Sequence, residues 1–110
     1  MSDRERRRSE NEVAFRNANE RVREVAESFR DVSESAEFVC ECGRGDCVER
    51  IRLTLEEYER IRSEPTWFFL VKGHEDIDLE GVVSEADGYL VVEKLPDGPA
   101  GVAIREDPRS

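Results

Sequence analysis

The sequence has little of what a membrane protein or a nucleic-acid-binding protein needs. No stretch of its 110 residues approaches the roughly 20 consecutive apolar residues of a membrane span, so we expect no membrane partner. Lysine and arginine number 17 against 27 aspartates and glutamates, which gives a net charge of -10. Because binding to a phosphate backbone depends on clustered Lys and Arg, we also expect no nucleic-acid partner. The charged first residues lack the apolar core of a signal peptide, which makes the cytoplasm the expected compartment.

The common catalytic motifs are also missing. The sequence contains no P-loop, no G-x-G-x-x-G and no G-x-S-x-G, and the Gly-His-Glu around its single histidine is not H-E-x-x-H. Its three cysteines are an odd number for disulfide pairing. In a reducing compartment such a cluster more often binds a metal or takes part in chemistry. We therefore expect a protein that is not an enzyme, and we look for a metal site.

The cysteines form the pattern C-x-C-x4-C at Cys40, Cys42 and Cys47. Cys40 and Cys42 stand two positions apart, so an extended chain would place their side chains on the same face, and Cys47 can join them on one ion only if the chain bends sharply. Gly43 and Gly45 follow directly and allow tight backbone bends. The pattern predicts a turn that gathers three thiolates.

His74 is the natural fourth ligand, since it follows a glycine in a predicted loop after an apolar strand. Zinc prefers four ligands in a tetrahedron, and Cys40, Cys42, Cys47 and His74 supply a Cys3His set that leaves no open position. A closed set of this kind predicts a structural Zn²⁺ that supports folding. The alternatives are free buried thiols with a surface histidine, an iron–sulfur cluster, or a catalytic Cys–His pair.

A long helix is predicted near the N-terminus. Ser9 stands three residues before Glu12, a capping-box spacing, so we expect the helix to begin there, after a disordered charged arm over residues 1–8. The apolar residues of the helix are spaced alternately three and four apart: Phe15, Ala18, Val22, Val25, Phe29, Val32 and Ala36. This stripe either packs on a sheet of its own domain, which we favour, or forms half of a homodimer through the helix.

Short strands and one short helix follow. The expected strands are 37–40, 47–53, 67–71 and 89–92, and the expected helix is 54–62. The pair Val82-Val83 is either a hairpin partner of the last strand or a short helix, and Asp87-Gly88 favours the hairpin. The result is an α+β fold: a long N-terminal helix packed on a small, mostly antiparallel sheet of four or five strands with one short helix and a zinc-stapled turn. We expect one domain over residues 9–95 and a flexible tail over 96–110.

Several of these motifs together resemble an uncharacterised family of small bacterial proteins. They are Cys-Glu-Cys-Gly at 40–43, the third cysteine at 47, Leu-Thr-Leu-Glu-Glu-Tyr-Glu at 53–59 and Gly-His-Glu at 73–75. Similarity in the first helix and in the last strand extends the resemblance over residues 11–94. It implies one unit in which the long helix belongs with the cysteine site, but it implies no activity.

We therefore expect a small, non-enzymatic zinc-binding protein that acts as a regulatory or protein-interaction module. Its partner is expected to be another protein, contacted through the helix stripe or an apolar patch. One alternative is a thiol-based redox switch that releases zinc on oxidation of Cys40, Cys42 or Cys47. The other is a small Cys/His enzyme that uses His74.

Overall fold

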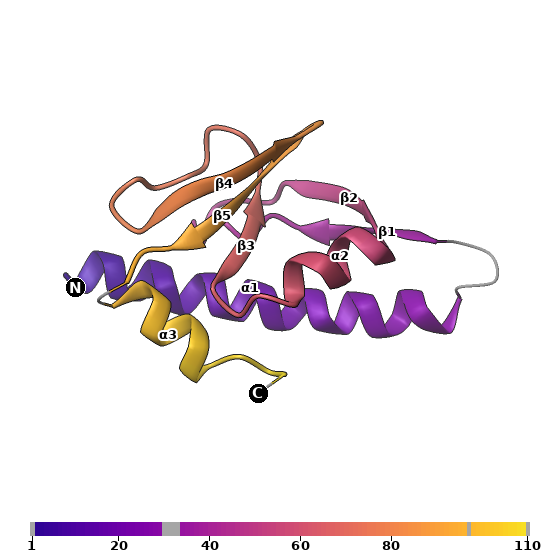
Figure 1. Ribbon diagram of the computed structural model, residues 1–110, viewed down its shortest axis with the longest axis horizontal. Helices are drawn as coiled ribbons and strands as arrows, with labels where there is room; N and C mark the ends of the chain where they lie inside the picture. The colour runs from indigo at the N-terminus through magenta and orange to yellow at the C-terminus, as the bar shows by residue number, and fades with distance from the viewer. Residues whose placement is uncertain (1, 30–33, 97, 110) are drawn as a thin grey trace.

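The computed structural model describes residues 2–29, 34–96 and 98–109, and it confirms the α+β class. The elements are α1 (Asp3–Ser28), β1 (Ser35–Val39), β2 (Arg50–Thr54), α2 (Leu55–Arg62), β3 (Trp67–Leu70), β4 (Glu80–Ala86), β5 (Tyr89–Lys94) and α3 (Pro99–Arg105). In Figure 1, α1 runs almost the length of the molecule, with the strands along one side of it and α3 beside its N-terminal half. No helix in the described ranges is long and apolar enough to cross a membrane.

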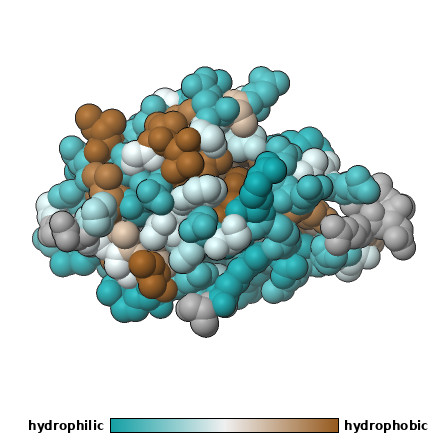
Figure 2. All heavy atoms as spheres, viewed as in Figure 1, coloured by the Kyte–Doolittle hydropathy of each residue, from teal (hydrophilic) through white to brown (hydrophobic). Residues whose placement is uncertain are grey.

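The five strands form two antiparallel sheets rather than the single sheet we expected. One sheet pairs β1 with β2, and the other has the order β3-β5-β4. Val82 and Val83 lie in β4, which is joined to β5 by a turn at Asp87-Gly88 with Gly88 at a φ of 90°, so the hairpin prediction is confirmed. The visible face of the molecule in Figure 2 is mostly hydrophilic, with separate apolar patches, as expected for a chain rich in charge.

An aromatic cluster holds the two sheets and α2 together. The rings of Phe38 in β1 and Tyr58 in α2 stack with centroids 4.4 Å apart. Phe69 of β3 meets both rings edge-on, at 6.1 Å from Phe38 and 6.0 Å from Tyr58. All three side chains are fully buried. Since each comes from a different element, the core sits where the two sheets and α2 converge, with α1 lying against it.

Helix α1 begins earlier than its sequence pattern suggested. Its N-cap is Ser2, whose hydroxyl accepts from the backbone N–H of Glu5 while the Glu5 carboxylate accepts from Ser2, a capping box that lowers the pKa of Glu5. Ser9, the predicted cap, lies inside the helix and is buried. Residues 3–8 are therefore helical, and the expectation of a disordered arm over 1–8 is wrong for the residues that the structure describes.

The two ends of the predicted helical stripe also differ from expectation. The helix ends at Ser28, so Ala36 lies in strand β1, and Val32 falls outside the described residues. The C-terminal segment, expected to be a flexible tail over 96–110, contains α3. Its Ala103 carbonyl accepts from Nη2 of Arg16 at 2.8 Å. Burial of α3 against α1 orders this segment.

The face of α1 that packs on the domain is polar, which is the largest departure from the predicted stripe. Its buried residues are Ser9, Glu12, Val13, Arg16, Asn19 and Glu20. Of the predicted apolar stripe, Phe15 and Val22 are half-buried, and Val22 packs against the core. Ala18 is exposed, while Val25 and Phe29 keep 61% and 59% of their surface exposed. The helix does pack on its own domain, as we favoured, but through a face that hydrophobic periodicity does not mark.

Several elements supply partners for this polar face, among them β1, α2, α3 and β5. Nζ of Lys94 in β5 lies between the carboxylates of Glu12 and Glu80. Burial raises the pKa of Glu12 to about 8, although the Lys94 ammonium opposes that rise. Asn19 bonds both backbone groups of Val39, at 2.8 Å to its N–H and 2.9 Å to its carbonyl. Because buried polar groups are tolerated only when paired, this face requires its particular neighbours.

Candidate metal centre

The four predicted ligand residues lie together at one side of the molecule. The sulfur atoms of Cys40, Cys42 and Cys47 and a ring nitrogen of His74 all lie within 4.8 Å of one another. Nδ1 of His74 is 3.6 Å from the sulfur of Cys40 and 3.6 Å from that of Cys47. This group could hold a metal ion, which makes it the candidate functional site.

The cysteine segment reaches the site because it leaves β1 and bends before it enters β2. The N–H of Cys40 still bonds the carbonyl of Glu49, at 3.1 Å, so the two sides of the turn remain paired. Within the turn, the N–H of Cys47 donates to the carbonyl of Arg44 at 3.2 Å. The sequence therefore placed the turn correctly between its two strands.

His74 reaches the site because β3 runs beside the cysteine segment. The N–H of Glu41 donates to the carbonyl of Phe69 at 2.9 Å, which joins the segment to β3. His74 lies in a turn, four residues after the end of β3. The backbone N–H of His74 donates to the carbonyl of Val71 at 3.0 Å. The sequence offered His74 only as the single histidine in a loop after an apolar strand, so its contact with the cysteine turn is a finding of the tertiary structure.

Glu41 lies between two of the cysteines but faces the other way. Its carboxylate accepts both Nη1 and Nη2 of Arg62, at 2.8 Å and 3.0 Å, and both side chains are fully buried. Side chains alternate along an extended chain, so Cys40 and Cys42 face the site while Glu41 faces the core. A buried ion pair therefore anchors the cysteine segment to the core, on the side opposite the candidate ligands.

Gly43 supplies the sharp bend, and it does so under two constraints. Its φ is 78°, in the left-handed region that favours glycine. A Cβ at this position would also lie 2.6 Å from the carbonyl oxygen of Arg8 and 2.6 Å from Cγ of Glu12, both in α1. Gly45, which we also expected to allow the bend, has open space around it. Of these two glycines, Gly43 is the one that lies close to α1.

Backbone N–H groups point at all three sulfurs. Val71 donates to the sulfur of Cys40 at 3.2 Å, and the N–H groups of Arg44 and Glu49 donate to Cys42 and Cys47. The last two donors each stand two residues after the cysteine that they serve. Because such bonds stabilise a thiolate, they offset part of the cost of burying the sulfurs in the form that binds metal.

The thiols also act on one another. A hydrogen bond from Cys40, helped by the Arg44 N–H, lowers the pKa of Cys42 to about 4. The same hydrogen bond to Cys42, together with burial, raises the pKa of Cys40, and burial raises the pKa of Cys47. The arrangement therefore favours the thiolate at Cys42 over the thiolates at Cys40 and Cys47, and a bound cation would draw off the remaining protons.

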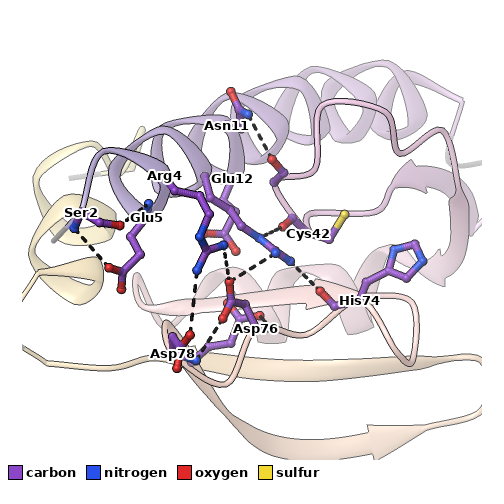
Figure 3. Close-up of polar contacts among 12 residues, drawn as sticks. Ser2, Arg4, Glu5, Asn11, Glu12, Cys42, His74, Asp76 and Asp78 are labelled. Carbon is purple, nitrogen blue, oxygen red and sulfur yellow. Dashed lines mark hydrogen bonds and ion pairs between the residues drawn. The ribbon is translucent and has the colours of Figure 1, made fainter.

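Arg8 of α1 clamps the two halves of the site together. Its Nε donates to the carbonyl of Cys42 at 2.8 Å, and its Nη2 donates to the carbonyl of His74 at 2.7 Å. Its Nη1 lies 3.3 Å from the Asp76 carboxylate, which also receives Nη1 of Arg4 at 3.2 Å (Figure 3). The Arg8 side chain is only 13% exposed. It is a positioning residue, since it holds the backbone of two candidate ligands and touches neither donor atom.

Sequence reasoning missed this clamp because it treated residues 1–8 as a disordered arm. Asn11, whose Nδ2 donates to the carbonyl of Gly43 at 3.0 Å, lies within the predicted helix, and it was missed because its partner stands 32 residues further along the chain. The signal was present in the Ser2–Glu5 spacing, which starts the helix early enough to place Arg4, Arg8 and Glu12 four residues apart on one face.

The site lies at the surface on one side. Cys40 and Cys42 are buried, whereas Cys47 and His74 are half-buried and line a hollow of about 230 Å³. Within the described part of the chain, the His74 ring contacts sulfur and has no carboxylate partner: the neighbouring Glu75 instead accepts the N–H of Gly73 at 2.7 Å. The third group that would orient a catalytic histidine is therefore not supplied there.

No protein-family model matches the chain, and no curated protein or solved structure is significantly similar to it. The resemblance to a family of small bacterial proteins stays a prediction. The functional argument accordingly rests on the geometry of the site.

Proposed function

We propose that Cys40, Cys42, Cys47 and His74 bind one Zn²⁺ and that the protein is a small, non-enzymatic zinc-binding module that acts by contacting another protein. The observation that carries the metal assignment is the distance between donor atoms. Bond lengths of about 2.3 Å to sulfur and 2.0–2.1 Å to nitrogen give a tetrahedral nitrogen–sulfur edge of about 3.6 Å. The two His74–cysteine distances are both 3.6 Å.

A structural role follows from the composition of the site. Four protein ligands fill the zinc shell and leave no position for water or substrate. Bound there, zinc would supply charge neutralisation and four bonds linking the β1–β2 turn to the loop after β3. A chain of this size buries a thin core, so such a link contributes directly to folding.

The short separations also favour one ion over an iron–sulfur cluster. Ligands of a multi-iron cluster bind different iron atoms and must stand further apart than donors that share a single ion. The 4.8 Å limit on the spread of the donors here suits one ion.

Elemental analysis of the purified protein tests the assignment. We expect about one zinc per chain, and X-ray absorption should give three sulfur neighbours and one nitrogen. Cys42→Ser should lose the metal, whereas Asp46→Ser, an exposed change in the same turn, should retain it. Iron with visible colour, or no metal at all, would contradict the proposal.

A redox switch is the second candidate, favoured by the exposure of Cys47 and the closeness of the three sulfurs. In this reaction two thiolates lose two electrons to form a disulfide, and a peroxide is reduced to water or alcohol with uptake of two protons, which releases the ion. Zinc release under mild peroxide that is reversed by a thiol reductant would support it. Retention of the metal under peroxide, or its irreversible loss, would argue for the structural role alone.

A further inference from the structure

The candidate metal centre is open to solvent on one side, and Cys47 lies on that side. The hollow of about 230 Å³ beside the centre is lined by Arg44, Asp46, Cys47, Val48, Glu49 and His74. Of the three cysteines, Cys47 is the one that lines it, while Cys40 and Cys42 keep only 2% and 0% of their surface exposed. A reagent that enters the hollow from solvent therefore meets Cys47 before the other two thiols.

Cys42 and Cys47 also differ in how their backbone is anchored. The carbonyl of Cys42 accepts Nε of Arg8 at 2.8 Å, which ties it to α1. The N–H of Cys47 donates to the carbonyl of Arg44 at 3.2 Å, inside the same turn, and every other residue from 44 to 50 is exposed. The sulfur of Cys47 can therefore be displaced without breaking the contacts that hold the turn on α1.

The size of the hollow limits what can react there. Its volume of about 230 Å³ is below the range of roughly 300–1,000 Å³ that is usual for drug-sized ligands. A small molecule fits such a space, whereas a folded partner that presents a thiol does not. Because a thiolate attacks a disulfide sulfur directly, a small organic disulfide is the class of reagent that could modify Cys47 from this hollow.

The charges that line the hollow select among small disulfides. Arg44 contributes one positive charge, and Asp46 and Glu49 contribute two negative charges. All three of these side chains belong to exposed residues, in a chain whose net charge is -10. A reagent that carries carboxylates is repelled by this lining, and one that carries amino groups is attracted.

We propose that Cys47 is a modification site, at which a small disulfide carrying amino groups forms a mixed disulfide with the protein. The Cys47 thiolate attacks one sulfur of the reagent, so that a new S–S bond forms while the old one breaks. The other half of the reagent leaves as a thiolate and takes a proton from water. Cys47 is thereby oxidised and the reagent is reduced.

The modification would regulate the metal centre by removing one of its four ligands. This consequence rests on the zinc site proposed above, whereas the order in which the cysteines react does not. Three ligands would remain, and we expect the affinity for zinc to fall at least about 100-fold, because loss of a supporting contact alone costs about 10–100-fold. A thiol reductant should reverse both the modification and the loss of affinity.

The test treats the full chain, purified with its metal, with cystamine and maps the products by mass spectrometry. Arg44 lies between Cys42 and Cys47, so tryptic cleavage after Arg44 and Arg50 isolates Cys47 in the peptide 45–50. Competition with a chromophoric chelator measures zinc affinity before and after modification. The same mapping in denaturant with a chelator present is the matched control, since it removes the fold and keeps the sequence.

We expect cystamine to modify the peptide 45–50 at least about tenfold faster than the peptide that carries Cys40 and Cys42. In denaturant the two peptides should react at similar rates per thiol. Equal rates in the folded protein, or an internal disulfide that forms with no mixed disulfide at Cys47 before it, would overturn the proposal. A preference for Cys47 that persists in denaturant would also overturn it, because the hollow would then have no part in the selection.

A second comparison tests the charge of the reagent. At low salt, cystamine should react at least about threefold faster than dithiodipropionate, a disulfide of similar size that carries two carboxylates. Glu49→Gln should reduce this ratio, whereas Glu56→Gln, an exposed change on α2, should leave it unaltered. Equal rates for the two reagents, or equal effects of the two variants, would overturn the assignment of amino groups to the reagent.

The proposal and the metal assignment can fail separately. Protein that carries no zinc and still reacts first in the peptide 45–50 would leave the modification site standing while the metal assignment fails. Zinc-loaded protein whose three cysteines react together would overturn the modification site and leave the metal assignment intact.

Discussion

The two ends of α1 meet the rest of the molecule in opposite ways. At the N-terminal end, Arg8 and Glu12 are drawn into ion pairs and hydrogen bonds with loops and strands from the other end of the sequence. At the C-terminal end, Val25 and Phe29 face outward beside an apolar groove between α1 and β1. A buried polar face holds its neighbours in one geometry because each charge needs its partner, whereas an open apolar face accepts any complementary surface. The first end holds the turn of the candidate metal centre in place, and the second leaves apolar surface exposed.

Removing the metal should give the largest effect and should separate the two ends. Zinc binding in small domains carries about 10 kcal/mol or more that is coupled to folding, so a strong chelator should lower the melting temperature by more than about 10 °C. Hydrogen exchange should rise first over residues 3–12 of α1, which dock on the cysteine turn. Equal exchange along the whole helix would mean that the site does not order its N-terminal end.

Breaking the buried ion pair behind the cysteine segment should cost about 3–5 kcal/mol. Glu41→Ala leaves the Arg62 guanidinium buried without its counter-charge. Glu37→Ala breaks an exposed pair with Arg52 on the neighbouring strand and should leave the unfolding midpoint in urea unchanged. Similar unfolding midpoints for both variants would show that the cysteine segment does not depend on the buried pair between Glu41 and Arg62.

Arg8→Ala should lower zinc affinity by about 10–100-fold, since it removes the bonds that orient two ligand segments. Competition with a chromophoric chelator measures this affinity. Arg7→Ala, an exposed change on the same turn of α1, should leave the affinity unaltered. If Arg8→Ala lowers thermal stability and zinc affinity is unaltered, the clamp supports the helix and does not position the ligands.

Glu12 should make stability fall as pH rises between about 4.5 and 8. Its pKa is raised by burial to about 8 in the folded protein, from the ordinary value of 4.5 for a glutamate. The folded state therefore binds this proton more tightly than the unfolded state, and its contribution is lost as pH rises through that window. The difference in unfolding free energy between wild type and Glu12→Gln should grow in favour of the variant from pH 5.5 to pH 8. Glu10→Gln, on the exposed face, should show no such trend.

The smallest effect is expected at the rim of the groove. Val25→Ala removes little buried surface and replaces a β-branched residue by the best helix former, so the unfolding free energy should change by less than about 0.5 kcal/mol. Chemical denaturation measures this change. A loss above about 1 kcal/mol would mean that Val25 is packed within the chain itself, and the contrast between the ends of α1 would weaken.

Local signals in the sequence predicted the elements well. The helix expected over 54–62 is α2, which begins at a capping box formed by Thr54 and Glu57, and Asp87-Gly88 does close a hairpin. The turn after Cys40 was also predicted, although strand β2 begins at Arg50 and not at Cys47, so the turn is longer than expected. Each of these features depends on a few neighbouring residues, whose backbone preferences act in any context.

Contacts between residues far apart in the sequence could not be predicted as well. The apolar stripe on α1 suggested the wrong buried face, because hydrophobic periodicity treats Glu12, Arg16 and Asn19 as solvated. These side chains are buried only because Lys94, the carbonyl of Ala103 and the backbone of Val39 meet them there. Nothing in the spacing of α1 alone specifies those partners.

By itself, the sequence determined the α+β class, the turn at residues 40–47 and the set of side chains able to hold a metal, since composition and short spacings decide these. Only the tertiary structure decided that His74 meets the cysteines beside β3, that Arg8 joins the two halves of the site, and that the C-terminal end of α1 is left open as a groove. The reason is physical: a buried charge is stable only beside its partner, and the partners of α1 lie tens of residues away along the chain.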